Sequence, residues 1–415
     1  MPPKRSDQST GPAPRFNCDN DYYRNLNLEP VGAGPLTLAA VYFQVRPPHL
    51  FPKSAPLVSP DGSSLAFIEH GVTLRVARLT ERSMWRSCDI NLGIFAHFGV
   101  SDGSAGSMAW ASNSEFLWTA ARDTARPIED YATSPMKPAR MGVDGHLDLL
   151  PPLAHAAGSL DALLWAGGDG LAVAQFGTRG TSYQPAHDDS NPTFAIVDAL
   201  GGRVLDTLPF SAIEPPPSQS RFGPPQTAVK QARTAILPDG RVRLLFRALR
   251  QWIVWTQGQR PVVLPDPYGI EVPPSHLVLS PDGSRVLIGR HLRTHGWIHI
   301  RGQGTIPGEP AEGVLVALHD VETGRELWTM RATAVRDFGF PAPSISPDGR
   351  TALVGLMPTE GIPPIGLLSA QDCKILQTLP APGGAYAMGF TRGGRAVWTN
   401  AEGLTALYEF HAGAP

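Results

Sequence analysis

The chain has 415 residues and a formal net charge of −2, and charged residues make up only 17% of it. Because the two signs are interspersed, the composition excludes a strongly basic nucleic-acid-binding surface and gives no attraction to an anionic membrane. No apolar run reaches the roughly 18 residues of a spanning helix, and no apolar core follows the charged N-terminus, so we expect neither a membrane span nor a secretory signal.

Three cysteines, Cys18, Cys88 and Cys373, are scattered and odd in number. This pattern indicates free thiols in a reducing compartment and neither a disulfide framework nor a zinc site, so we expect a cytoplasmic protein. The 43 glycines and 42 prolines favour many short strands joined by many turns.

The polar, proline-rich N-terminus predicts a mostly disordered tail over residues 1–35. The strand-like segment LTLAAVYFQV follows, from Leu36 to Val45, without a hairpin of its own. We expect this segment to supply a missing outer strand elsewhere in the fold.

One turn is then repeated four times between apolar runs: LVSPDGSSLAF from Leu57, AILPDGRVRLLF from Ala235, LVLSPDGSRVLIG from Leu277 and SISPDGRTALVG from Ser344. Proline fixes φ, aspartate bonds the neighbouring backbone, and glycine takes the left-handed conformation needed to re-enter a strand. Weaker copies near Ser112, Gly168 and Gly393 bring the total to seven predicted hairpins.

A second repeat aligns VDALGGRVLDTLP from Val197, HDVETGRELWTM from His319 and LSAQDCKILQTLP from Leu368. Two hairpins per unit make a four-stranded antiparallel sheet, which is one propeller blade. These motifs resemble the bacterial WD40-like propeller repeats of the TolB type, and the second hairpin is similar to YVTN-type repeats. The resemblance covers about residues 55 to 410 and implies a fold without implying an activity.

We therefore predict an all-β, seven-bladed propeller of four-stranded antiparallel blades, forming a single domain over residues 36–412. The last blade, with AYAMGF, RAVWTN and LTALYEF, lacks one strand. The segment from Leu36 to Val45 is expected to complete that blade and close the ring.

Alternate connections of such a propeller leave from opposite ends, and here one class is short and the other long and polar. The long connections are residues 94–106, 122–142, 177–193, 210–226, 265–275 and 290–313. Because minimal turns suffice to join strands, long connections on one face favour binding, although tolerated insertions also explain them.

Histidines and arginines are densest in RHLRTHGWIHIR, where His291, His295 and His299 alternate with Arg290, Arg293 and Arg301. A helix would present a metal-binding face at this spacing, but the flanking sequences favour strands, with a hairpin across Thr294 to Gly296. We expect polar hairpin tips or an anion contact and no bound metal.

Three titratable residues, His187, Asp188 and Asp189, are adjacent in QPAHDDSNP. They could hold a cation or act as acid and base, but a solvated turn before Pro192 explains them equally well.

Further candidates for binding a ligand or partner occur in other long connections. Arg122 and Asp123 lie in one of them, and Arg247 and Arg250 in another. The arginines could hold a carboxylate or phosphate, or these residues could form surface ion pairs. Tyr268 and Arg336 are also candidate contacts.

Two further sequence patterns are not interpreted as functional sites. GVSDG satisfies the hydrolase motif around Ser101 but lacks the flanking strand and helix that the motif requires. The tryptophans recur in predicted strands, where packing between blades accounts for them.

The sequence supports two hypotheses of function. The first is a cytoplasmic scaffold that binds a protein or peptide through the long connections, with aromatic contacts such as Phe210, Phe222, Phe338 and Phe340. The alternative is a small-molecule enzyme or sensor of lyase, isomerase or hydrolase type, with a small anionic ligand at the mouth of the central channel. No cofactor, nucleic acid or membrane partner is expected.

Overall fold

The structure is a computed structural model. It describes residues 15–16, 27–43, 57–61, 63–69, 73–78, 85–89, 108–122, 136–158, 160–167, 169–176, 193–213, 230–248, 251–264, 276–289, 295–300, 304–309, 311–334, 343–357, 364–381, 387–391, 393–401 and 404–411. Within these ranges the chain is almost wholly β-structure, with one short 3-10 helix, η2 (Phe210–Ala212).

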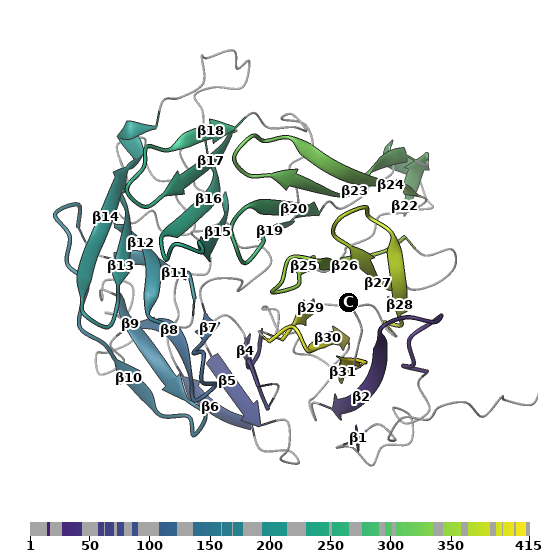
Figure 1. Cartoon of the computed structure of the whole chain (residues 1–415), viewed down its shortest axis with the longest axis horizontal. Helices are drawn as coiled ribbons and strands as arrows, with labels where there is room; N and C mark the ends of the chain where they lie inside the picture. Colours follow the sequence, from purple (N-terminus) through teal and green to yellow (C-terminus); the bar gives the residue numbers. More distant parts are fainter. Residues whose placement is uncertain are drawn as a thin grey trace, which may run out of the picture.

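Four-stranded antiparallel sheets follow one another along the chain and surround a central axis (Figure 1). The first three consist of β3 (Leu57–Val58), β4 (Ser64–Glu69), β5 (Thr73–Arg78) and β6 (Trp85–Asp89); β7 (Ala109–Trp110), β8 (Phe116–Arg122), β9 (Met136–Gly142) and β10 (Leu147–Leu149); and β11 (Leu160–Trp165), β12 (Leu171–Phe176), β13 (Thr193–Asp198) and β14 (Arg203–Pro209).

The next three consist of β15 (Lys230–Ile236), β16 (Val242–Ala248), β17 (Gln251–Thr256) and β18 (Val262–Leu264); β19 (His276–Leu279), β20 (Arg285–Gly289), β23 (Ala311–Asp320) and β24 (Glu326–Ala334); and β25 (Ser344–Ile345), β26 (Thr351–Gly355), β27 (Ile365–Ser369) and β28 (Ile375–Leu379). This arrangement is a β-propeller.

The predicted hairpins of both repeats are confirmed. The SPDG-type turns join β3 to β4, β15 to β16, β19 to β20 and β25 to β26, and the second repeat joins β13 to β14, β23 to β24 and β27 to β28. Gly240, Gly283 and Gly349 have φ values of 84°, 67° and 70°. These turn glycines therefore adopt the left-handed conformation that the motif predicted.

The predicted blade count is wrong. Over the described residues, the structure shows six four-stranded antiparallel blades, and the predicted seventh is replaced by a five-stranded mixed sheet in the order β1-β2-β31-β30-β29. Its strands are β1 (Arg15–Phe16), β2 (Leu36–Phe43), β29 (Ala387–Phe390), β30 (Ala396–Ala401) and β31 (Leu404–Phe410), and β1 runs parallel to β2. A uniform repeat model fails here because β1 comes from a segment that shares no motif with the repeats.

Ring closure by the N-terminal strand is not evident either. β2 pairs antiparallel with β31, from Leu36 opposite Phe410 to Phe43 opposite Leu404. Innermost strands of neighbouring sheets contact one another at β3 and β7, β11 and β15, β15 and β19, β19 and β25, and β25 and β29. Among the strands described, no contact of similar extent links the β3–β6 sheet to the five-stranded sheet.

The chain before β2 packs across two sheets instead. Val31 forms a bridge to Thr378 of β28, with its N–H 2.7 Å from the Thr378 carbonyl oxygen. Leu28 is buried, and the buried Gln377 side chain bonds both backbone groups of Leu36. Residues 27–35, assigned to the tail by sequence, thus connect the β25–β28 sheet to β2, whereas residues 1–14 and 17–26 lie outside the described ranges.

The core lies between adjacent sheets. Trp118 of β8 stacks on Trp165 of β11 with ring centroids 5.1 Å apart, and Phe194 of β13 lies 5.1 Å from Phe246 of β16. All four side chains are buried. The prediction that tryptophans pack between blades is confirmed for this pair.

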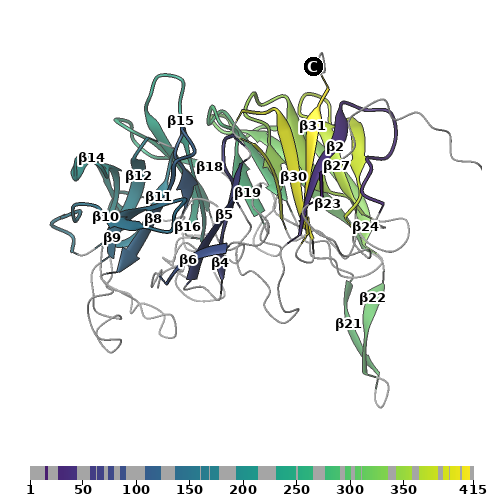
Figure 2. The same cartoon turned by 90° about the horizontal axis from the view of Figure 1, so that it is seen from below.

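Antiparallel order gives the ring two different ends. We call "turn end" the one with the hairpin turns between first and second and between third and fourth strands, and "loop end" the opposite one. A separate hairpin of β21 (His295–Ile300) and β22 (Gly304–Glu309) interrupts the β20–β23 connection and projects from the loop end (Figure 2).

Candidate functional site

Most of the predicted site residues lie outside the described residues, and their placement stays a prediction. These are Asp123, His187, Asp188, Asp189, Arg250, Tyr268, His291, Arg293 and Arg336. The same holds for Ser101, Phe222, Phe338 and Phe340.

The backbone is described for three of the predicted site residues. Arg122 is the last residue of β8, Arg247 lies next to the last residue of β16, and His295 is the first residue of β21. All three positions are at the loop end, but they belong to three separate strand pairs. The structure therefore places them on one side of the ring without joining them in one cluster.

The predicted histidine hairpin and one aromatic contact need correction. His295–Ile300 is a continuous strand that pairs with Gly304–Glu309, with Ile300 opposite Gly304, so the predicted hairpin across Thr294 to Gly296 is wrong. Phe210 is 6% exposed and belongs to the core beside Ile213. Its burial leaves no surface with which to contact a partner.

Cross-strand register places the candidate residue Arg247 opposite a basic residue that the sequence analysis did not single out. Lys230 lies directly opposite Arg247 at the loop end of β15 and β16, and a bulge separates this pair from Arg233 opposite Leu245. Arg233 is only 6% exposed and donates from Nη1 to the Ala232 carbonyl oxygen at 2.8 Å. Positions 230 and 247 are far apart in the sequence, so only strand pairing reveals their proximity.

Polar contacts at the turn end connect neighbouring sheets. The Asp61 N–H donates to Ser114 Oγ at 3.2 Å, Ser112 Oγ donates to Asp169 at 3.0 Å, and Trp328 Nε1 donates to the Ala370 carbonyl oxygen at 2.9 Å. In the first two of these contacts, the turns of neighbouring sheets bond one another directly.

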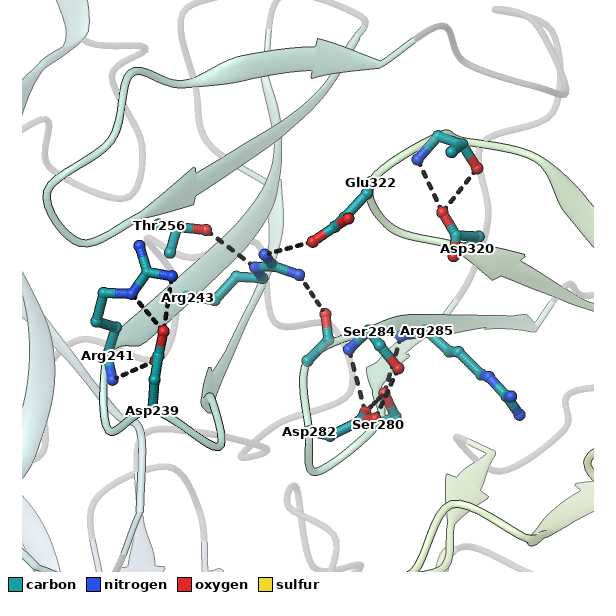
Figure 3. A network of polar contacts seen from close by, with 12 residues as sticks. Asp239, Arg241, Arg243, Thr256, Ser280, Asp282, Ser284, Arg285, Asp320 and Glu322 are labelled. Carbon is teal, nitrogen blue, oxygen red and sulfur yellow. Dashed lines mark hydrogen bonds and ion pairs between the residues drawn. The ribbon is translucent and has the colours of Figure 1, made fainter.

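Arg243 makes the most extensive of these links (Figure 3). Its Nη1 donates to the Gly283 carbonyl oxygen at 2.8 Å, its Nε donates to Thr256 Oγ1 at 2.9 Å, and its Nη2 lies 3.4 Å from Glu322. The Arg243 side chain is 8% exposed, whereas that of Glu322 is 75% exposed. The carbonyl and hydroxyl bonds, which water does not screen, therefore carry most of this interaction.

The turn aspartates are bonded within their own turns. Asp282 accepts from Ser280 Oγ, Ser284 Oγ and the Ser284 N–H (Figure 3). Asp348 likewise accepts from Ser346 Oγ and the Arg350 N–H. Partial burial alone would raise the pKa of Asp282, but the bonds from Ser280 and Ser284 outweigh it and hold that pKa below its ordinary value. These carboxylates serve turn formation.

Stability is expected to fall with pH in two stages. Burial lowers the pKa of His319 below 6.5 in the folded state. As the pH drops below about 6.5, this imidazole is protonated in the unfolded chain before it is protonated in the folded one, so stability falls. Asp61, Asp282 and Asp348 have lowered pKa values in the folded state, so they stabilise the fold above about pH 3.8, the pKa of the unfolded carboxyl groups. This stability is lost as the pH falls through the lower pKa values of the folded state. Thermal melts between pH 3 and pH 8, compared for wild type and His319→Gln, test this. A first stage that persists unchanged in the variant would contradict the role of His319.

Within the described ranges, no group of three histidine, cysteine, aspartate or glutamate side chains is arranged to hold a metal ion. In the same part of the chain, no helix has the length and apolar character needed to cross a membrane. No protein-family model matches the chain, and no curated protein matches it significantly. Membership of a WD40-like or TolB-type family and a cytoplasmic location stay predictions.

Proposed function

We propose that this β-propeller is a scaffold that binds a protein or peptide partner through its loop end. The observation that carries the proposal is the difference between the two ends of the ring. Turn-end connections are short, and several of their described polar groups bond a neighbouring sheet.

Connections at the loop end are longer. The long connections between strands at this end are residues 90–108, 123–135, 177–192, 214–229 (after η2) and 265–275. Short connections at the same end are residues 70–72, 249–250 and 402–403. The β20–β23 connection includes the β21–β22 hairpin, which forms its own sheet away from the ring. Extended connections on one side of a repeat scaffold are the usual place for partner contacts.

The hairpin offers a direct test. Residues 290–310 are replaced by a Gly/Ser linker of about six residues, which spans the gap between Gly289 and Ala311 without imposing structure. We expect this variant to keep the wild-type melting temperature and lose the partner that the wild type captures. The matched control, Arg241→Gln with Glu322→Gln, changes exposed charges at the turn end and should keep the partner.

Two results would count against the proposal. One is a partner retained at full yield by the hairpin-replaced protein and by similar replacements of residues 177–192 and 214–229. The other is a partner lost in the turn-end control.

A further inference from the structure

Residues 27–43, which we call the strap, cross the edge of the β25–β28 sheet and then form β2. Four of its apolar side chains are buried in one core cluster: Leu28, Leu36, Leu38 and Val41. The other buried members of that cluster all lie between Leu353 and Tyr408. In the part of the chain that the structure describes, no core cluster joins the strap to an earlier sheet.

Hydrogen bonds of the strap lead to the same two sheets. The Val31 N–H donates to the Thr378 carbonyl oxygen at 2.7 Å, and the Thr378 N–H donates back at 3.5 Å. Gln377 bonds both backbone groups of Leu36, and β2 continues the pairing along β31. A Cβ at Gly34 would lie 2.5 Å from Cδ of Gln377, so a larger residue does not fit there. The docking site is therefore shaped for the sequence of the strap.

All of these contacts are made to residues 353–411, whereas the strap is joined to β3, at the other end of the ring of sheets, through residues 44–56. The contacts are therefore the same whether the strap comes from the same chain or from a second copy. An extended chain of the length of residues 44–56 spans about 40 Å. Exchange of an identical element between two copies costs little, because each contact that is lost in one copy is regained in the other.

Two large apolar side chains are exposed on the strap and on the strand that it crosses. Val31 is 61% exposed, and Ile375 of β28 is 46% exposed. When two copies exchange straps, each docking site lies within the reach of one connection from the other copy, so the second copy is close enough to cover these side chains. Burial of their apolar surface favours the pair over two separate copies.

We propose that two copies of this chain exchange their straps, so that the docking site on β28 and β31 of each copy holds residues 27–43 of the other. The occupant is a second copy because its strap carries the glycine and the leucines that the site accepts. Exchange depends on concentration, since a tethered segment competes at an effective concentration of about millimolar. The loop end takes no part, so the exchange is independent of the scaffold proposal.

Disulfide trapping between two different full-length chains tests the exchange directly. One chain carries Val31→Cys and the other Thr378→Cys, each in a background in which the three native cysteines are replaced by serine. Opposed residues that bond each other across an antiparallel pair have Cα atoms about 5.5 Å apart, which a disulfide bridges. The two chains carry different tags, are coexpressed and are then oxidised. We expect a covalent heterodimer on a non-reducing gel, with the 31–378 link identified by mass spectrometry.

Two controls show that the link reports a docked strap. Ile375→Cys replaces Thr378→Cys on the same strand but lies about 10 Å further along it, too far for a disulfide with position 31. We expect at least tenfold less heterodimer from this pair. Adding Gly34→Ala to the chain with Val31→Cys should reduce the 31–378 link to a similar extent, because the strap no longer fits beside Gln377.

A single chain with both Val31→Cys and Thr378→Cys distinguishes exchange from docking within one copy. The proposal requires part of this variant to run as a covalent dimer. If it closes its disulfide entirely as a monomer, and the mixed chains give no more heterodimer than the Ile375→Cys control, each copy keeps its own strap and the inference is overturned. A double variant that forms no 31–378 disulfide at all would overturn it as well, because the strap would then not dock on β28.

Discussion

Replacing Gln377 by alanine is expected to lower the free energy of unfolding by about 2–4 kcal/mol, because two buried backbone groups lose their hydrogen-bond partner. The Gln377 Oε1 accepts from the Leu36 N–H at 2.8 Å, and its Nε2 donates to the Leu36 carbonyl oxygen at 3.0 Å. Gln377 is 5% exposed and Leu36 is 2% exposed, so water does not replace these bonds. Urea denaturation followed by tryptophan fluorescence measures the loss.

Gly34 provides an independent test of the same contact. A Cβ at this position would lie 2.5 Å from Cδ and 2.7 Å from Cβ of Gln377, so Gly34→Ala should also displace the amide. Gln371→Ala, in the exposed β27–β28 turn, is the matched control and should leave stability unchanged. Equal stability of Gln377→Ala and the control would show that the N-terminal chain does not stabilise the β25–β28 sheet.

Arg243→Ala is expected to lower the free energy of unfolding by about 2–4 kcal/mol, because it leaves the Gly283 carbonyl oxygen and the Thr256 hydroxyl without their charged donor. The same urea titration measures this loss.

Comparison with Glu322→Gln shows which bond of Arg243 accounts for the loss of stability in Arg243→Ala. Glu322 is mostly exposed, so its removal should change stability little even though it is the ionic partner. A cost for Glu322→Gln as large as that for Arg243→Ala would mean that the ion pair, and not the carbonyl bond, joins the two sheets.

Local sequence signals predicted the parts of the fold that are locally determined. The SPDG-type turns combine a proline, an aspartate that accepts from nearby serines, and a glycine with positive φ, so their positions follow from residues adjacent in sequence. Contacts between residues far apart in the sequence are not marked by any such local motif. The Leu36–Gln377 bonds span 341 residues, and the parallel pairing of β1 with β2 has no motif, so the uniform seven-blade prediction failed at the five-stranded sheet.

For the three candidate residues whose backbone is described, the sequence indicated one side of the ring and not which residues oppose one another. Strand ends place Arg122, Arg247 and His295 at the loop end, as the alternation of short and long connections indicated. The opposition of Lys230 and Arg247 depends on a bulge before Arg233, which shifts the register in a way that residue spacing does not reveal. The histidine hairpin was misplaced for a similar reason, since the chain reverses after Ile300.

A photo-crosslinking scan from both ends of the ring tests the central claim most directly. A photoreactive residue is placed singly in the β21–β22 hairpin at Thr305, and at Glu115 and Asp239 in exposed turns of the turn end. The account predicts a crosslinked partner from position 305 and none from positions 115 and 239. Crosslinks to the same partner from the turn end alone, or equally from both ends, would contradict it.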